Sequence, residues 1–372
     1  MRIGFDVAQT CVEKAGCGWY ADALIRAMIK AAPQHNYTLY HHFDGWINPT
    51  TAAGTTLAGA GAMEPFREMD AAQAEAAWAR VRRGDPLPGQ PDVVQANCYQ
   101  APRLTGSKLV FTIYDVSFWT VPEYTTEANR LACQDGMLDA LGNADGFVFI
   151  SQSSRDEFER VLPGWLGRAG KPWAVTPLGP KTGALAVPRP EIRTYWLAVG
   201  SLEPRKNYEA LLNAMEIYWP RSARRLPLRI AGGPGWKSEQ LQGRIQEMHL
   251  RGMVTHLGYV PEDQLPGLYA GAEALIFPSW YEGFGLPVIE AMTQGCPVIS
   301  SDRTSLREVT GDAALLIDPS QPGQIADAML RLEAEDGLAS QLSRASRLQA
   351  SRFTWEVTAA QTLELYRRVL AA

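Results

Sequence analysis

The sequence has few cysteines, little excess charge and no long apolar segment. Its five cysteines form no Cys-x-x-Cys pair and their number is odd, which argues against a disulfide framework and a zinc site. No apolar run approaches the roughly 20 residues that span a bilayer, and no charged stretch followed by an apolar segment opens the chain. We therefore expect a cytoplasmic protein without a transmembrane helix or signal peptide.

An excess of basic residues is also lacking, since the formal net charge is −5. Binding along nucleic acid needs a basic face, so we expect no nucleic-acid partner. The sequence contains no Asp-x-Asp, and we therefore expect no metal that bridges phosphates. We also expect no other cofactor. The length of 372 residues exceeds what one hydrophobic core usually supports, which indicates at least two domains.

Twelve short apolar runs alternate with helix-length segments, six runs in each half of the chain. Runs of this kind are typical of buried parallel strands with helices on both faces of the sheet. The pattern predicts an α/β protein made of two Rossmann-like, doubly wound domains. The Gly- and Pro-rich stretch 179–194 should separate them, which places one domain at 1–182 and the other at 190–352.

Residues 44–90 carry no strand pattern, and we expect a mobile loop with a short helix at Ala71–Arg83 that shapes an acceptor site. The stretch Trp78–Gly84 contains three arginines, Arg80, Arg82 and Arg83. Two interpretations stay open for it, a peripheral contact with lipid headgroups and an ordinary solvated helix face.

A strand that ends at Gly200 is followed by a short loop, with Arg205 and Lys206 at the start of the next helix. A guanidinium fork and an ammonium beside a helix N-terminus form a strong diphosphate site. Solvated surface charge is the alternative. The position favours a ligand site, because ligands of such sheets bind at the carboxyl ends of the strands.

Two glutamates, Glu282 and Glu290, bracket the turn before a helix that begins near Pro287. We place Glu290 in the first helical turn, where the helix dipole favours an acid, but this does not explain Glu282. Carboxylates accept hydrogen bonds from vicinal hydroxyls, while amides at a helix N-terminus bind phosphate. The turn therefore predicts a nucleotide-sugar site, in which the two glutamates bind hydroxyls at either end of the ligand and the amides bind its diphosphate. Its glycines are Gly283 and Gly285, and its donor amides are those of Phe284, Gly285 and Leu286.

In the first half, Gly16-x-Gly18 precedes a predicted helix and partly matches a dinucleotide-binding fingerprint. The preceding strand ends near Val7, so the glycines come late for a tight strand–turn–helix. An acid after the second strand, Asp44, keeps an NAD-binding interpretation open.

Together these segments resemble the retaining glycosyltransferases of family four, which have the GT-B fold. "YEGFGLPVIEAM" resembles the family's E-x(7)-E signature, and "GSLEPRKN", "ISQSSRDEF", "LGYVPEDQLPGLYAGAEALIFPS" and "DAALLIDP" are also similar to its members. The resemblance covers nearly the whole chain. It implies two domains facing a central cleft, with the acceptor mainly on the first and the donor on the second. It also implies that the final helix, 353–372, crosses back to the first domain.

The resemblance also implies roles for the motif residues. Glu290 would bind the donor ribose, and Glu282 with the turn 283–286 would meet the transferred sugar or its phosphates. Arg205 and Lys206 would neutralise the diphosphate leaving group. These three, Arg205, Lys206 and Glu282, form the expected catalytic set.

Further donor contacts are implied at five positions. Gly16 and Gly18 would close over the diphosphate, and Tyr259 and Val260 fall where the family's base-contacting loop lies. Ser201 stands where many relatives carry Arg, which leaves more of the charge to the two cations that follow it.

On the acceptor side the chain departs from the family's pattern. It reads Tyr114-Asp115 where relatives usually read His-Asp, and its histidines lie elsewhere in the sequence. A tyrosine can hydrogen-bond a sugar hydroxyl, but it cannot supply an imidazole that titrates near pH 7.

The expected activity is a retaining, metal-independent transfer of a hexosyl unit, mannose from GDP-mannose first, to a glycan or lipid-linked glycan in bacterial polysaccharide biosynthesis. Two alternatives stay open. One is a non-catalytic subunit that binds sugar-nucleotides, and the other is a sugar-nucleotide epimerase on the same fold.

Overall fold

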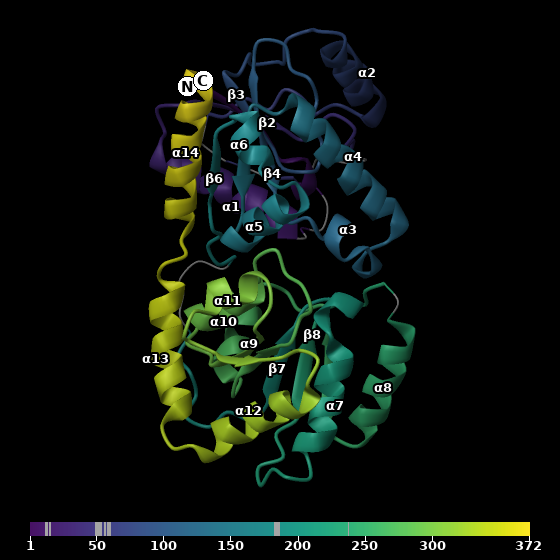
Figure 1. Ribbon diagram of the computed structural model, residues 1–372, viewed down its shortest axis with the longest axis vertical. Coiled ribbons are helices and arrows are strands. Elements are labelled where there is room, and N and C mark those ends of the chain that lie inside the picture. The colour runs from purple at the N-terminus through teal and green to yellow at the C-terminus, as the bar shows by residue number, and fades with distance from the viewer. Residues whose placement is uncertain are drawn as a thin grey trace. The chain divides into compact units, whose positions relative to one another are not determined.

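Figure 1 shows the computed structural model, which describes residues 1–11, 14, 16–48, 54, 55, 57, 61–181, 187–236 and 238–372. The chain divides into two compact units. The first comprises Met1–Leu178 and Thr354–Ala372, and the second comprises Gly179–Phe353. Each unit contains one six-stranded sheet in which every neighbouring pair is parallel. The prediction of two doubly wound domains is confirmed, and two such units are the components of the GT-B fold.

The sheet of the first unit has the order β2-β1-β3-β4-β5-β6. Its topology reverses between β1 and β3, which places a switch point at the carboxyl ends of these two strands. Strand residues are mostly buried on both faces, as the apolar runs predict. The strands are β1 Arg2–Asp6, β2 Asn36–Tyr40, β3 Val93–Ala96, β4 Lys108–Ile113, β5 Gly146–Phe149 and β6 Trp173–Val175.

Seven α-helices and two short 3₁₀ helices lie within the described residues of this unit. The last helix, α14, packs against α1, and the hydroxyl of Tyr366 donates to Oε1 of Gln95 in the sheet. The C-terminal helix therefore belongs to the first unit, as expected. The helices are η1 Ala8–Thr10, α1 Gly16–Ala31, α2 Ala71–Arg82, α3 Ser117–Thr120, η2 Pro122–Tyr124, α4 Glu127–Asn143, α5 Gln152–Val161, α6 Trp165–Ala169 and α14 Trp355–Ala371.

Helix α2 matches the helix predicted in the stretch 44–90, and parts of that stretch lie outside the described residues. It begins with a capping box in which Asp70 and Gln73 exchange hydrogen bonds. Trp78 is fully buried in the core, and Arg82 pairs with two acids. Trp78 is therefore a core side chain, and a contact of this helix with lipid headgroups stays a prediction.

The second unit has the order β12-β11-β10-β7-β8-β9, so its switch point lies between β7 and β10. Its strands are β7 Trp196–Val199, β8 Leu228–Ala231, β9 Val254–Gly258, β10 Leu275–Phe277, β11 Val298–Ser301 and β12 Leu315–Ile317. Its helices are η3 Pro204–Lys206, α7 Tyr208–Tyr218, α8 Glu239–Leu250, α9 Leu265–Gly271, α10 Leu286–Thr293, α11 Ser305–Thr310, α12 Pro322–Ala334 and α13 Leu338–Ala350.

Candidate functional site

The two motifs singled out in the second half of the sequence meet at the switch point of the second sheet. Arg205 and Lys206 follow β7, and Glu282 follows the neighbouring strand β10. The backbone amide of Trp280 donates to the carbonyl of Arg205 at 2.9 Å, which ties the two loops together. Asn207 adds a second link between these loops. Its side-chain amide donates at 3.0 Å to the carbonyl of Pro278, the first residue after β10.

Glu282 is held by both cations. Its Oε2 accepts from Arg205 Nη1 at 2.7 Å, and its Oε1 accepts from Lys206 Nζ at 2.6 Å. Burial alone would raise the pKa of Glu282, but the charges of Arg205 and Lys206 outweigh it and lower that pKa to about 2. Burial lowers the pKa of Lys206, against the opposing charge of Glu282. The predicted catalytic set is therefore one ionic cluster, in which Lys206 and Glu282 are buried and Arg205 is partly buried.

The N-terminus of α10 carries the predicted donor amides. Gly285 has φ +103°, and a Cβ there would lie 2.6 Å from a leucine side chain, so the turn needs glycine. The hydroxyl of Ser305 donates to the carbonyls of Glu282 and Phe284, at 2.8 and 2.9 Å, and fixes the turn. Among the described residues the amides of Phe284, Gly285 and Leu286 donate to no other group. Such amides are suited to binding an anion, and a phosphate contact here stays a prediction.

Glu290 is the fifth residue of α10, so its placement in the first helical turn was wrong. The helix dipole therefore contributes little to it, because the effect falls off within the first turn. Its carboxylate is buried, and Oε2 accepts from the Tyr269 hydroxyl at 2.8 Å. Within the described chain Oε1 makes no hydrogen bond, and burial raises the pKa of Glu290 against the nearby charge of Lys181. A buried acceptor of this kind is suited to a ligand hydroxyl.

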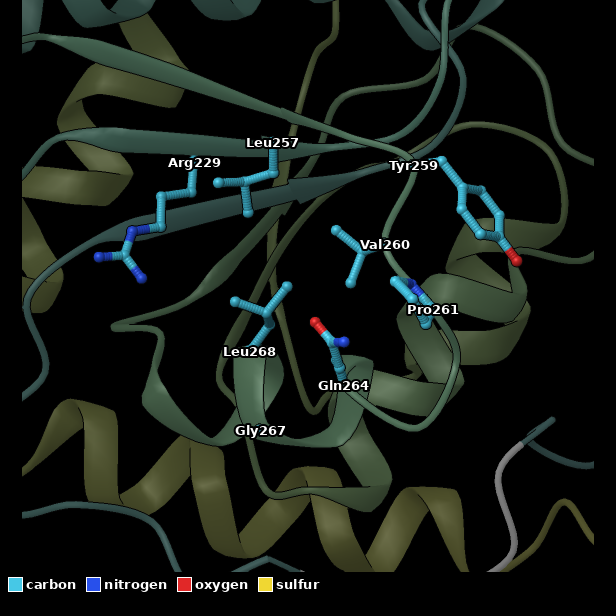
Figure 2. A pocket seen from close by; sticks show the side chains of 8 residues that line it. All are labelled: Arg229, Leu257, Tyr259, Val260, Pro261, Gln264, Gly267 and Leu268. Carbon is cyan, nitrogen blue, oxygen red and sulfur yellow. The ribbon is translucent and has the colours of Figure 1, made fainter.

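Tyr259 and Val260 line a cavity of about 460 Å³ that runs between β9 and α9 (Figure 2). Figure 2 shows Arg229 and Tyr259 at opposite ends of it. Leu268 lines the cavity, whereas the next residue, Tyr269, binds Glu290. Successive side chains on a helix point about 100° apart, so this cavity and Glu290 lie on different sides of α9. A base contact by Tyr259 and Val260 stays a prediction.

Gly16 and Gly18 lie in the first unit, within the first turn of α1 rather than before it. A Cβ on Gly18 would lie 2.5 Å from the carbonyl oxygen of Gln9, whereas a Cβ on Gly16 would meet nothing within 4 Å. Only Gly18 is therefore required by packing. Asp44, which kept the NAD interpretation open, is paired with Arg82 at 2.7 Å.

Tyr114 and Asp115 also belong to the first unit. The Tyr114 hydroxyl donates to the carbonyl of Asn97 at 2.9 Å, and burial raises the pKa of Tyr114 well above its usual value. Its ring packs against Tyr20 and Tyr99. An acceptor contact by Tyr114 stays a prediction. While the hydroxyl donates to Asn97, its oxygen is left to accept a hydrogen bond from a sugar hydroxyl.

Two residues of the site were missed in the sequence. Glu203 Oε1 accepts from Arg205 Nη2 at 3.0 Å, and Glu203 Oε2 accepts from the indole N–H of Trp236 at 3.3 Å. The signals were present, because Glu203 lies two residues before Arg205 and Trp236 follows a Gly-rich loop after β8. Ser201, by contrast, is exposed in the β7 loop.

Two kinds of feature are absent from the described residues. None of their helices combines the length and apolar character needed to cross a bilayer. They also contain no group of three or more His, Cys, Asp or Glu side chains placed to hold a metal ion.

Comparisons with known proteins agree with this fold. The chain is 33% identical over 280 residues to O-antigen chain mannosyltransferase B of Escherichia coli, covering 73% of this chain and 72% of that one. The sucrose-phosphate synthase of Thermosynechococcus elongatus has a TM-score of 0.73 at 20% identity, over 100% and 99% of the two chains. HepE of Anabaena, solved with UDP and glucose, has a TM-score of 0.69 at 18% identity, over 98% of each chain.

The profile of the family described as glycosyl transferases group 1 matches residues 186–349. This range contains every residue of the ionic cluster and all of α10. Together with the relative that is matched over most of both lengths, it establishes the family. The chain belongs to the group 1 glycosyltransferases and is a hexosyltransferase with the GT-B fold.

Proposed function

We propose that the protein transfers a mannosyl unit from GDP-mannose to a glycan or lipid-linked glycan acceptor, with retention of configuration and without a metal. One observation carries the proposal: two cations and a set of unpaired amides converge at the switch point of the second sheet. The choice of mannose and of a polysaccharide acceptor is supported by the similarity to an O-antigen chain mannosyltransferase.

In this proposal Arg205, Lys206 and the amides of α10 bind the diphosphate. The bond between the anomeric carbon and the phosphate oxygen breaks, and negative charge develops on the departing diphosphate. Preorganised cations and amides stabilise that charge, which is the role a metal has in other transferases. The acceptor hydroxyl attacks from the same face of the sugar, and its proton passes to an oxygen of the leaving phosphate.

The two glutamates would hold hydroxyls at either end of the donor. Glu290 has a buried oxygen available for the ribose. Glu282 is already bound to two cations, so its part is to orient them and to accept from the sugar with its remaining lone pairs. We expect no covalent glycosyl-Glu282 intermediate. The loop of Tyr259 and Val260 would contact the base, and Ser201, Gly16 and Gly18 the phosphates.

A transfer assay in EDTA tests the proposal. Purified protein is incubated with GDP-, UDP-, ADP- or dTDP-sugars and a mannose-terminated acceptor, and the product's anomeric configuration is read by NMR. Transfer of mannose from GDP-mannose with the donor's α configuration is expected. Binding of nucleotide with no sugar released would instead indicate a non-catalytic subunit, and donor turnover without acceptor an epimerase.

A further inference from the structure

The formal charges of four described side chains at the proposed diphosphate site, those of Arg205, Lys206, Glu282 and Glu203, sum to zero. Arg205 and Lys206 bring two positive charges, and Glu282 accounts for one negative charge bound to both. The second negative charge is Glu203, whose carboxylate lies 3.0 Å from Arg205. The exposed fractions of the Glu203 and Arg205 side chains are 19% and 24%, so their interaction is only partly screened by solvent.

The position of Glu203 is fixed from a second strand. Trp236, in the loop after β8, donates its indole N–H to Glu203 at 3.3 Å. That loop is joined to the β7 loop, because the amide of Leu202 donates to the carbonyl of Gly233 at 3.0 Å. A Cβ on Gly235 would lie 2.5 Å from the carbonyl oxygen of Leu202, so the two loops touch through their backbones. Glu203 therefore has a defined place beside Arg205 and is not a solvated side chain.

A counter-charge at this point works against anion binding. If tight diphosphate binding were the only requirement, Glu282 would be the only acid beside Arg205 and Lys206, and the site would keep one net positive charge. The diphosphate carries one more negative charge in the released nucleoside diphosphate than in the nucleotide-sugar. A positively charged site would therefore bind the product more strongly than the donor. A neutral cluster weakens that hold more than it weakens the hold on the donor.

We propose that Glu203 is a positioning and charge-balancing residue, which holds Arg205 and limits the affinity of the site for the released nucleoside diphosphate. The inference depends on the proposed function, since it assumes that a diphosphate binds at Arg205. The diphosphate and Glu203 compete for the same guanidinium, and Glu203 favours product release.

The test is calorimetric titration of GDP and UDP into the full chain and three variants: Glu203→Gln, Arg205→Ala, and the two combined. Glutamine keeps the size and shape of the side chain and removes the charge. It retains one acceptor oxygen for Arg205 or Trp236 and loses the other hydrogen bond, because its amide nitrogen only donates. Glu203→Gln should lower the dissociation constant for the nucleoside diphosphate by roughly 5- to 10-fold at low salt, with a smaller gain at high salt. In the Arg205→Ala background the same substitution should give less than about a 2-fold change.

The direction of the effect separates this role from a structural one, because damage to the fold weakens binding and does not strengthen it. Glu209→Gln is the matched control, since Glu209 pairs on the surface of the same unit with Arg244 and should leave the affinity unchanged. A dissociation constant that is unchanged or higher in Glu203→Gln would overturn the inference. A wild-type protein that binds neither GDP nor UDP would overturn the proposed function, and the inference with it.

Discussion

Replacing Glu282 by alanine should destabilise the second unit strongly. The change removes the partner of Lys206, whose side chain is only 10% exposed, and leaves a buried ammonium uncompensated. Breaking a buried ion pair on one side costs about 3–5 kcal/mol. The bond to Arg205 adds less, because that side chain is 24% exposed and partly solvated after the change. We therefore expect a loss of about 3 kcal/mol, near the lower end of that range.

Differential scanning calorimetry measures this loss as a lower melting temperature. For a unit of this size, about 3 kcal/mol corresponds to a decrease of about 6–12 °C. A second substitution, Lys206→Met, should restore part of the loss in the Glu282→Ala background, because it removes the unpaired charge. The control Glu209→Ala should shift the melting temperature by less than about 2 °C. If Glu282→Ala melts like the wild type, the ionic cluster does not stabilise this unit and the reasoning is refuted.

The same cluster predicts a pH dependence. The pKa of Glu282 is about 2 in the folded protein and lies below its ordinary value of 4.5. A group whose pKa is lower in the folded protein stabilises the fold at pH values above its unfolded-state pKa. This stabilisation is lost as the pH falls toward the folded-state pKa. The difference in melting temperature between wild type and Glu282→Gln should therefore be full above about pH 5 and shrink between pH 4.5 and 2. A difference that stays constant over this window would contradict the low pKa.

Three further predictions concern single side chains. Glu290→Ala should weaken nucleotide binding by roughly 10- to 100-fold in calorimetry, and an unchanged affinity would remove Glu290 from the site. Gly18→Ala should destabilise the first unit by about 1–3 kcal/mol because its methyl meets a carbonyl, whereas Gly16→Ala should be neutral or slightly stabilising; similar melting temperatures would contradict the contact. Tyr114→Phe should cost about 1 kcal/mol of stability without changing nucleotide affinity, and a loss of acceptor affinity alone would show that its hydroxyl binds the acceptor instead.

The elements were predictable because burial leaves a strong pattern. The twelve strands of the described residues and the final helix coincide with apolar runs of the sequence, as in "KLVFTI" and "WLAV", most of which are buried. The turn before α10 was predictable too, since Gly283 and Gly285 beside Pro287 fit few conformations. Local sequence was therefore enough to predict the fold and the position of the turn before α10.

The contacts inside the site were not predictable from local sequence. The expectation that Glu282 meets the transferred sugar stays a prediction, but the sequence did not show that both of its oxygens bind Arg205 and Lys206, which follow another strand. The acceptor contact of Tyr114 also stays a prediction, and the sequence did not show that its hydroxyl donates to the carbonyl of Asn97, in the loop after β3. In each case the partner lies far away in sequence, and the pairing is decided by how the strands are ordered in the sheet.

The central claim is that cationic side chains and helix amides, without a metal, bind the diphosphate of the donor. Calorimetric titration of GDP into wild type and Arg205→Ala, each with and without EDTA, tests it most directly. The account predicts binding that EDTA does not change and that Arg205→Ala weakens by roughly 10-fold or more. Binding that requires a divalent metal, or that is equally strong in Arg205→Ala, would contradict it.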